Sequence, residues 1–140
     1  HGPGQTTGYV IADVRAHGGV RRFVQALVAA MRDASGLAGA APGADAMGLY
    51  VQGRKLGSVG IRVSDGIATH GLALNRSPDL TWFARMSACG APEVPATSIA
   101  AEDGDPTRTR VDAALAQALA THLGLGELVP TTLAELTRAG

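Results

Sequence analysis

The amino-acid sequence predicts an α+β fold, a mostly antiparallel sheet covered by helices, with residues 1–140 as a single domain. Two strand-like runs, Lys55–Val63 and Ile67–Asn75, flank Asp65-Gly66, which is typical of a tight hairpin because both residues accept positive φ. Two longer segments, 20–34 and 107–123, repeat apolar residues every three to four positions, as amphipathic helices do. A chain of this length buries roughly two thirds of its unfolded surface in one core.

The first half of the chain is expected to hold two short strands around one helix. Thr7–Val14 is predicted as a strand. Gly18-Gly19 is expected to interrupt the regular structure, and the helix over 20–34 follows it. Residues 36–46 consist largely of alanine, glycine and proline, which indicates a loop. A brief strand over Leu49–Val51 is then expected to lead into the hairpin.

The hairpin has a register that follows from its loop. If Asp65-Gly66 is the two-residue loop, residues whose numbers sum to 131 face each other, so Gly60 pairs with Gly71 and Ile61 with His70. Two opposed glycines leave a gap without side chains, into which backbone N–H groups or an elongated ligand can come close. The alternative interpretation of the same glycines is a bulge or a barrel-like bend.

The second half of the chain is expected to be mainly helical. Asp79–Met86 is predicted as a short helix that Asp79 caps, and a proline-flanked loop with Cys89 follows it. The helix over 107–123 is expected to end at Gly124, and a last short helix is predicted over 133–138.

Composition excludes several classes of function. The 12 basic and 12 acidic residues cancel, so no electrostatic footprint for nucleic acid is present. No apolar run approaches the ~20 residues that span a bilayer, and a lone cysteine fits a reducing compartment, so we expect a cytoplasmic protein without membrane contact. No CxxC, HExxH or phosphate-loop motif occurs, so we expect no metal and no nucleotide cofactor. The chain begins at His1 within a turn-forming run, and we expect further sequence upstream of it.

Cys89 and Lys55 are the only cysteine and the only lysine in the chain. A thiol becomes a strong nucleophile when it ionises, and a nearby cation favours the thiolate, so the pair is a candidate for covalent acyl transfer. Lys55 would favour the thiolate and then carry the proton that the transfer requires. The alternatives are that Cys89 is a small buried apolar residue and that Lys55 is a solvated lysine at a strand start.

His70 is a further candidate because it stands beside a strand glycine. An imidazole there could orient a substrate or act as a base, whereas the alternative is that it satisfies a local backbone group. His17 and His122 are interpreted as structural or surface residues.

Several blocks of the sequence, taken in order, resemble lipoyl(octanoyl) transferases. They are His1-Gly2-Pro3-Gly4-Gln5 with Gly8-Tyr9, Lys55–Arg62, Thr69–Asn75, Asp79-Leu80 with Phe83, Cys89-Gly90 and Thr97-Ser98. The resemblance is strong over about residues 1–100 and loose in the C-terminal helix. It implies the fold of the biotin and lipoate protein ligase catalytic domain, without an ATP step.

The resemblance also implies roles for individual residues. Cys89 would take octanoate from acyl carrier protein as a thioester and pass it to a lysine on a lipoyl domain of 2-oxoacid dehydrogenases or on glycine cleavage H protein, with Lys55 as its partner. No cofactor is implied. Substrate contacts are expected at the following residues: His1, Ser58, Val59, Gly60, His70, Gly71, Leu72 and Ala73.

The chain departs from the family pattern at defined places. Ala88 stands where the family usually has proline before the cysteine, and the family's N-terminal part with its Arg-Gly-Gly segment would lie upstream of His1. The same sequence blocks leave two alternative interpretations open. The protein could be a non-catalytic truncated homologue that only binds a partner or an acyl chain, or it could be an ATP-dependent lipoate-protein ligase.

Overall fold

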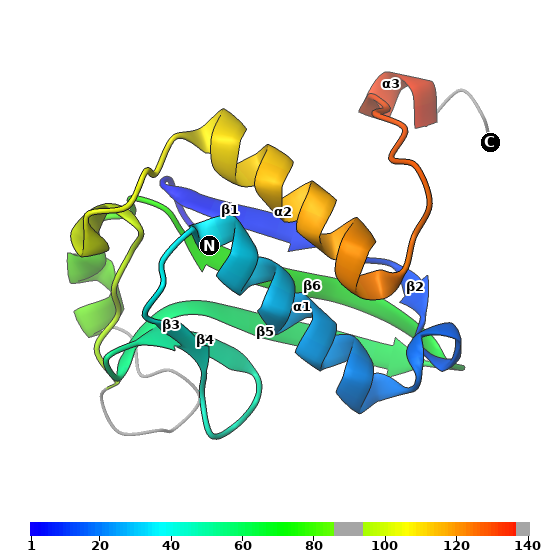
Figure 1. The fold of residues 1–140 in the computed structure, drawn as a ribbon, viewed down its shortest axis with the longest axis horizontal. Coiled ribbons are helices and arrows are strands. Elements are labelled where there is room, and N and C mark those ends of the chain that lie inside the picture. Colours follow the sequence, from blue (N-terminus) through cyan, green and yellow to red (C-terminus); the bar gives the residue numbers. More distant parts are fainter. Residues whose placement is uncertain (86–93, 137–140) are drawn as a thin grey trace.

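The computed structural model describes residues 1–85 and 94–136, which form a sheet with helices packed on it (Figure 1). The elements, in chain order, are β1 (Gln5–Tyr9), β2 (Ala12–Asp13), the 3₁₀ helix η1 (Val14–His17), α1 (Val20–Ser35), β3 (Ala40–Pro42), β4 (Gly48–Val51), β5 (Arg54–Ser64), β6 (Ile67–Asn75), the 3₁₀ helices η2 (Leu80–Arg85) and η3 (Ala100–Glu102), α2 (Arg108–Leu123) and α3 (Leu133–Leu136).

The strands make one antiparallel sheet in the order β1-β6-β5-β4-β3, with β2 also paired to β6. In the β5–β6 hairpin, Gly60 pairs with Gly71 and Ile61 with His70, so the predicted register is confirmed. Asp65 and Gly66 both have positive φ, as the turn requires. The α+β class and the mostly antiparallel sheet are therefore confirmed.

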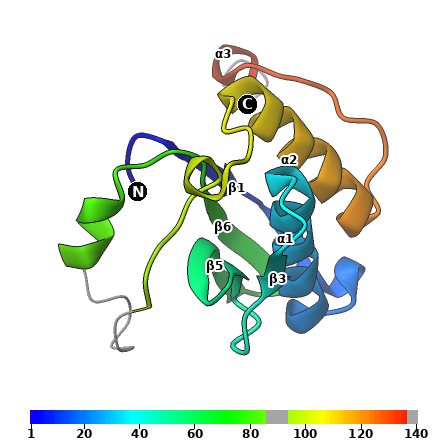
Figure 2. The same ribbon diagram turned by 60° about the vertical axis from the view of Figure 1, so that its left-hand side comes forward.

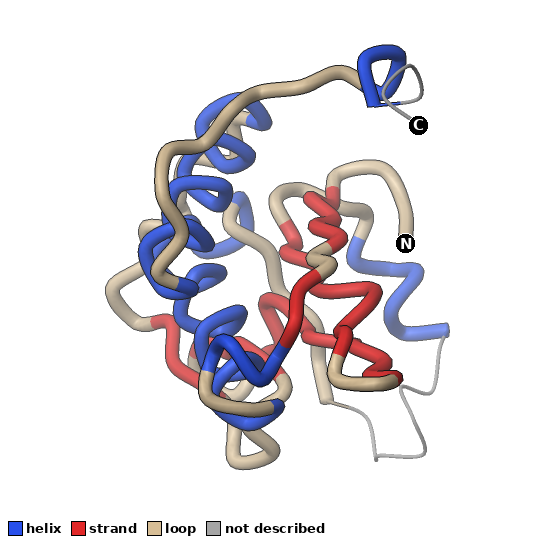
Figure 3. The backbone as a smooth tube through the Cα atoms, turned by 90° about the vertical axis from the view of Figure 1, so that its right-hand side faces the viewer, coloured by secondary structure: helices blue, strands red, loops and turns tan. Residues whose placement is uncertain are grey.

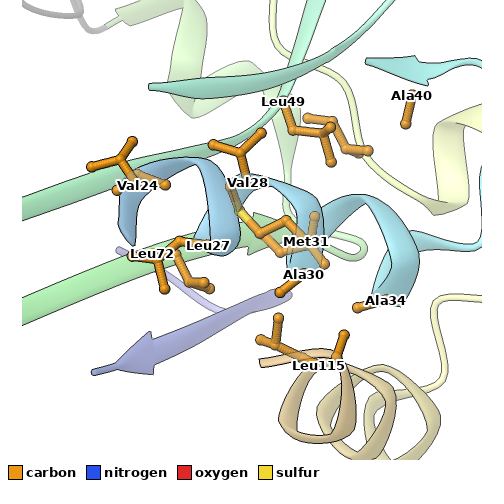
Figure 4. Close-up of a cluster of buried hydrophobic side chains, with 14 of the residues drawn as sticks. Val24, Leu27, Val28, Ala30, Met31, Ala34, Ala40, Leu49, Leu72 and Leu115 are labelled. Carbon is orange, nitrogen blue, oxygen red and sulfur yellow. The ribbon is translucent and has the colours of Figure 1, made fainter. Parts of the chain in front are cut away.

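The two long helices lie together on one face of the sheet. Figures 2 and 3 show α1 and α2 on that side and the short η2 helix on the other. Figure 4 shows Leu27 and Met31 of α1 in one cluster with Leu72 of the sheet and Leu115 of α2. Leu27 and Met31 are fully buried, so this layer is the hydrophobic core. The face that α1 and α2 cover is called the helix face below, and the opposite one the open face.

Both long helices form where the apolar spacing predicted them. Each ends on a glycine in the left-handed region, Gly36 after α1 and Gly124 after α2, which a side chain would disfavour. The predicted end at Gly124 is therefore confirmed.

The strand predicted over Thr7–Val14 is interrupted in the structure. β1 and β2 pair with β6 in one continuous register but are separated by Val10 and Ile11, and Val14 begins η1. The interruption lies opposite His70, whose φ of 68° is left-handed and whose carbonyl accepts the Val10 N–H at 2.6 Å. The local irregularity of β6 is thus the physical reason for the break.

Residues 36–46, predicted as a loop, contain the short strand β3. Alanine and proline are poor strand formers, and β3 exists because its backbone pairs with β4 at the edge of the sheet. An edge is the one place in a sheet that readily accepts Pro42, which has no N–H to donate.

The remaining differences are at the ends of helices. Asp79–Met86 was predicted as a helix, and the described part is the 3₁₀ helix Leu80–Arg85, with the Asp79 carboxylate accepting the Thr81 N–H at 3.0 Å. The helix predicted over 133–138 is α3 as far as Leu136, and it stands away from the body of the protein in Figures 1 and 3. Within the described ranges, no helix has both the length and the apolar character to cross a membrane.

Candidate functional site

The candidate site lies on the open face of β5 and β6. Ser58 and Gly60 are exposed there, whereas the alternating residue Val59 is buried on the helix face opposite its partner Leu72. The side chains of Val59 and Leu72 therefore belong to the core. Any contact that these two predicted substrate residues make with a ligand on the open face would come through their backbone.

Lys55 reaches the open face because β5 contains a bulge. In a regular strand Lys55, Gly57 and Val59 would share one face. The register against β4 shifts between Leu49 and Tyr50, so Gly57 pairs with Leu49 while Lys55 pairs with Tyr50.

Leu56 is the extra residue of this bulge, and its fully buried side chain lies in the core cluster. One inserted residue thus turns Lys55 away from the helix face. The Lys55 Nζ lies 5.4 Å from the centre of the Tyr50 ring, on the same side of the sheet.

The backbone of Lys55 is joined to residues 95–97, which follow Cys89 in the sequence. The Lys55 N–H donates to the carbonyl of Pro95 at 2.8 Å, and the Thr97 N–H donates to the carbonyl of Lys55 at 2.9 Å. These bonds form a parallel bridge between Lys55 and Ala96. Cys89 itself lies outside the described residues, so the predicted Lys55–Cys89 relationship stays a prediction.

A partly buried carboxylate that the sequence reasoning missed reinforces this junction. Glu102 accepts a hydrogen bond from the Thr97 hydroxyl at 2.5 Å and three bonds from the Arg54 guanidinium, one from Nε at 3.0 Å and two from a terminal nitrogen at 2.8 and 2.9 Å. The Thr97 hydroxyl, followed by Arg54, holds the pKa of Glu102 below its ordinary value. No sequence motif signals this contact, because Glu102 stands 48 positions from Arg54.

The Gly60–Gly71 gap predicted from the register is open on one side only. In the part of the chain that the structure describes, nothing lies within 4 Å of the position that a Cβ on Gly60 would take. A Cβ on Gly71 would instead collide with the carbonyl oxygen of Gly8 in β1. At Gly71 the backbone of β1 therefore fills the gap between the side-chain-free strands, and the space stays free of described atoms only at Gly60. Ala73, also predicted to contact substrate, is buried opposite Ser58.

The two predicted site histidines lie at separate places. His70 is exposed at the irregularity of β6 next to Gly71, and its left-handed φ is a conformation in which histidine is enriched among non-glycine residues. His1 is exposed before β1, in the segment whose Gly4 carbonyl accepts the N–H groups of Arg76 and Ser77. His122, interpreted from sequence as a surface or structural residue, hydrogen bonds to Asp33 at 2.7 Å and so joins α2 to α1.

The described residues offer two features to a reaction on the open face. These are the ammonium group of Lys55 and a surface beside Gly60 that carries no side chain. Among the same residues there is no cluster of three or more His, Asp or Glu residues that could hold a metal ion. An extended apolar chain can lie along such a surface because no side chain projects from Gly60. The arrangement suits proton transfer next to an elongated ligand.

Known proteins resemble this chain in sequence and in fold. The octanoyltransferase of Alcanivorax borkumensis is 39% identical over 128 residues, which are 89% of this chain and 52% of that protein. The octanoyltransferase of Pseudomonas savastanoi pv. phaseolicola is 39% identical over 137 residues, 94% of this chain and 62% of that protein. The chain thus spans between about half and two thirds of the length of these curated relatives.

A solved structure from an archaeon shares the fold. A bi-partite lipoate protein ligase of Thermoplasma acidophilum, described with its E2 lipoyl domain, superimposes with a TM-score of 0.69 at 17% identity, over 99% of this chain and 59% of that one. At this level of identity the likeness concerns the fold alone, and it confirms the ligase-type catalytic fold expected from the sequence.

A family model described as the lipoyl protein ligase A/B catalytic domain matches residues 1–120. This range contains β1 to β6, α1, Lys55 and most of α2. The open face with Lys55 and Gly60 therefore lies within the matched region, and the chain belongs to the lipoyl protein ligase A/B catalytic domain family.

Proposed function

We propose that the protein is an acyltransferase of lipoate biosynthesis that moves octanoate from acyl carrier protein to a lysine of a lipoyl domain or of glycine cleavage H protein. The names of the two curated relatives support octanoyl transfer, and the pairing of the Thermoplasma ligase with a lipoyl domain supports the acceptor. Cytoplasmic localisation is part of the same proposal, because both substrates would be met there.

The reaction proceeds in two balanced steps. The Cys89 thiolate attacks the octanoyl thioester carbon, the carrier's sulfur leaves as a thiolate and takes up a proton, and octanoyl-Cys89 remains. The neutral ε-amine of the acceptor lysine then attacks this thioester, forms the amide and gives up a proton as Cys89 leaves. Lys55 would supply the proton in the first step and favour the thiolate between turnovers.

The single observation that carries the proposal is the placement of Lys55. The bulge at Leu56 directs the only lysine of the chain to the open face, beside the surface that Gly60 leaves free. Pro95 and Thr97 join the same residue to the chain that follows Cys89. In a regular strand the same side chain would point to the helix face, away from this surface.

Intact mass spectrometry tests the proposal directly. After incubation with octanoyl-acyl carrier protein, we expect a mass gain of one octanoyl group, its loss in Cys89→Ser, and a slower gain in Lys55→Met, which keeps the length of the side chain but removes its charge. An adduct that survives Cys89→Ser would overturn the proposed nucleophile.

Two further measurements separate the alternatives. If Cys89 is alkylated with the pH dependence of an ordinary thiol, with a pKa of about 8.5, and no adduct forms, the chain is a non-catalytic homologue. If free octanoate is attached to a lipoyl domain only when ATP is present, the protein is a ligase.

A further inference from the structure

We propose that Tyr50 is a positioning residue for Lys55, and that its ring holds the ammonium group at one place on the open face. This inference rests on the proposed function, because it assigns Tyr50 a part in presenting the proton carrier. Tyr50 belongs to β4 and was not among the residues that the sequence singled out.

The contact follows from the register of the sheet. Tyr50 and Lys55 are direct cross-strand partners, and the Lys55 Nζ lies 5.4 Å from the ring centre. A cation within about 6 Å of a ring centre is attracted by the negative face of the aromatic system. The bulge that turns Lys55 to the open face also brings it into register with Tyr50, so one irregularity produces both features.

The ring attracts the ammonium without competing for its proton. Among the described residues, no carboxylate lies within ion-pair distance of Lys55, although Arg54 beside it is paired with Glu102. A carboxylate partner would both fix the charge and accept a proton, whereas an aromatic face has no site for one. A lysine that must exchange protons with a substrate is therefore better held by a ring than by an acid.

The Tyr50 ring is itself held by the β3–β4 hairpin. It lies over Gly43 and Gly48, where an added Cβ would collide with its edge carbons, at 2.7 Å from Cε2 in the case of Gly48. The Gly43 N–H donates to the Gly48 carbonyl at 3.0 Å and closes the hairpin under the ring. Two glycines thus make room for the ring.

The backbone contacts of Lys55 leave only its side chain to be positioned. Pro95 and Thr97 fix the main chain of Lys55 on one side, and the pairing with Tyr50 fixes it on the other. Four rotatable side-chain bonds remain, and the Tyr50 ring lies near the end of the side chain.

Nuclear magnetic resonance can test this contact without any catalysis, because Lys55 is the only lysine. In protein labelled with ¹³C-lysine, we expect the Lys55 ε-methylene protons to be shifted upfield by the ring current. The shift should disappear in Tyr50→Leu, remain in Tyr50→Phe and remain in the matched control Tyr9→Leu, which changes the other tyrosine. A random-coil shift in the wild type, or an unchanged shift in Tyr50→Leu, would overturn the inference.

Kinetics then test the functional part. We expect Tyr50→Leu to lower kcat about two- to fivefold, which corresponds to the ~0.5–1 kcal/mol of an exposed cation–π contact, with KM for octanoyl-acyl carrier protein unchanged and activity restored in Tyr50→Phe. Gly48→Ala, which displaces the ring and leaves both partners intact, should act like Tyr50→Leu. Equal kcat in the wild type and Tyr50→Leu would overturn the positioning role. If the wild type transfers no octanoate, the proposed function fails, while the resonance experiment still decides the contact.

Discussion

Thr97 donates its backbone N–H to the carbonyl oxygen of Lys55 at 2.9 Å, and this bond joins two parts of the chain that are 42 positions apart. Together with the bond from the Lys55 N–H to Pro95, it attaches the segment after Cys89 to β5. The Thr97 side chain is bonded in turn to Glu102, which also binds Arg54, the neighbour of Lys55. The surroundings of Lys55 are therefore fixed by groups that lie far from it in sequence.

Substitution of Glu102 by Gln is expected to destabilise this junction. The side chain keeps an acceptor for the Thr97 hydroxyl but loses the charge that pairs with Arg54, so we expect the free energy of unfolding to fall by about 1 kcal/mol. Urea denaturation at pH 7 measures the change. Glu127→Gln in the exposed C-terminal tail is the matched control, and equal stabilities of the two variants would contradict the prediction.

The link between α1 and α2 is expected to depend on pH. His122, the main cause, and Arg32 hold the pKa of Asp33 below its ordinary value of 3.8. Because the pKa is lowered in the folded state, the stability from Asp33 is present above about pH 4 and is lost as pH falls through the folded value.

The variant Asp33→Asn makes this prediction measurable. Its stability should lie below that of the wild type near pH 6, and the difference should shrink as pH falls below 4. Unfolding curves at several pH values give the comparison. A difference that stayed constant down to pH 2.5 would mean that Asp33 is not the titrating group.

The two paired glycines are expected to respond differently to substitution. Gly71→Ala places a Cβ against the Gly8 carbonyl and should destabilise the fold by about 1–3 kcal/mol, because the backbone of β1 cannot move away freely. Gly60→Ala meets no described atom within 4 Å and should change stability by less than about 0.5 kcal/mol.

Larger substitutions at Gly60 probe the surface rather than the fold. Gly60→Val is expected to leave the melting temperature nearly unchanged and to slow octanoyl transfer, since its side chain would occupy the space beside β5. Thermal unfolding and adduct formation are measured on the same preparation. Full activity in Gly60→Val would show that the acyl chain does not lie there.

The β5–β6 hairpin and the two long helices could be predicted because their signals are local. Asp65-Gly66 fixes the loop, the loop fixes the register, and the register pairs Gly60 with Gly71 without knowledge of any other element. The spacing of Phe23, Leu27 and Met31 likewise specifies the buried side of α1.

The features that escaped the sequence reasoning depend on partners that are distant in the chain. β3 forms from residues of low strand propensity because β4 offers hydrogen bonds at the sheet edge. The space beside Gly71 is occupied by the backbone of β1. The bulge at Leu56 has no local signature, since it exists only relative to the register of β4. The contact of Glu102 with Arg54 and Thr97 is of the same kind.

The sequence by itself therefore determined the fold class, the hairpin register and the residues that carry the family resemblance, because periodicity and turn chemistry act over a few residues. Only the tertiary structure decided which way Lys55 points and what surrounds it. The physical reason is that a strand alternates its two faces strictly, so a single extra residue, placed by pairing with a neighbouring strand, reverses the direction of the side chain beyond it.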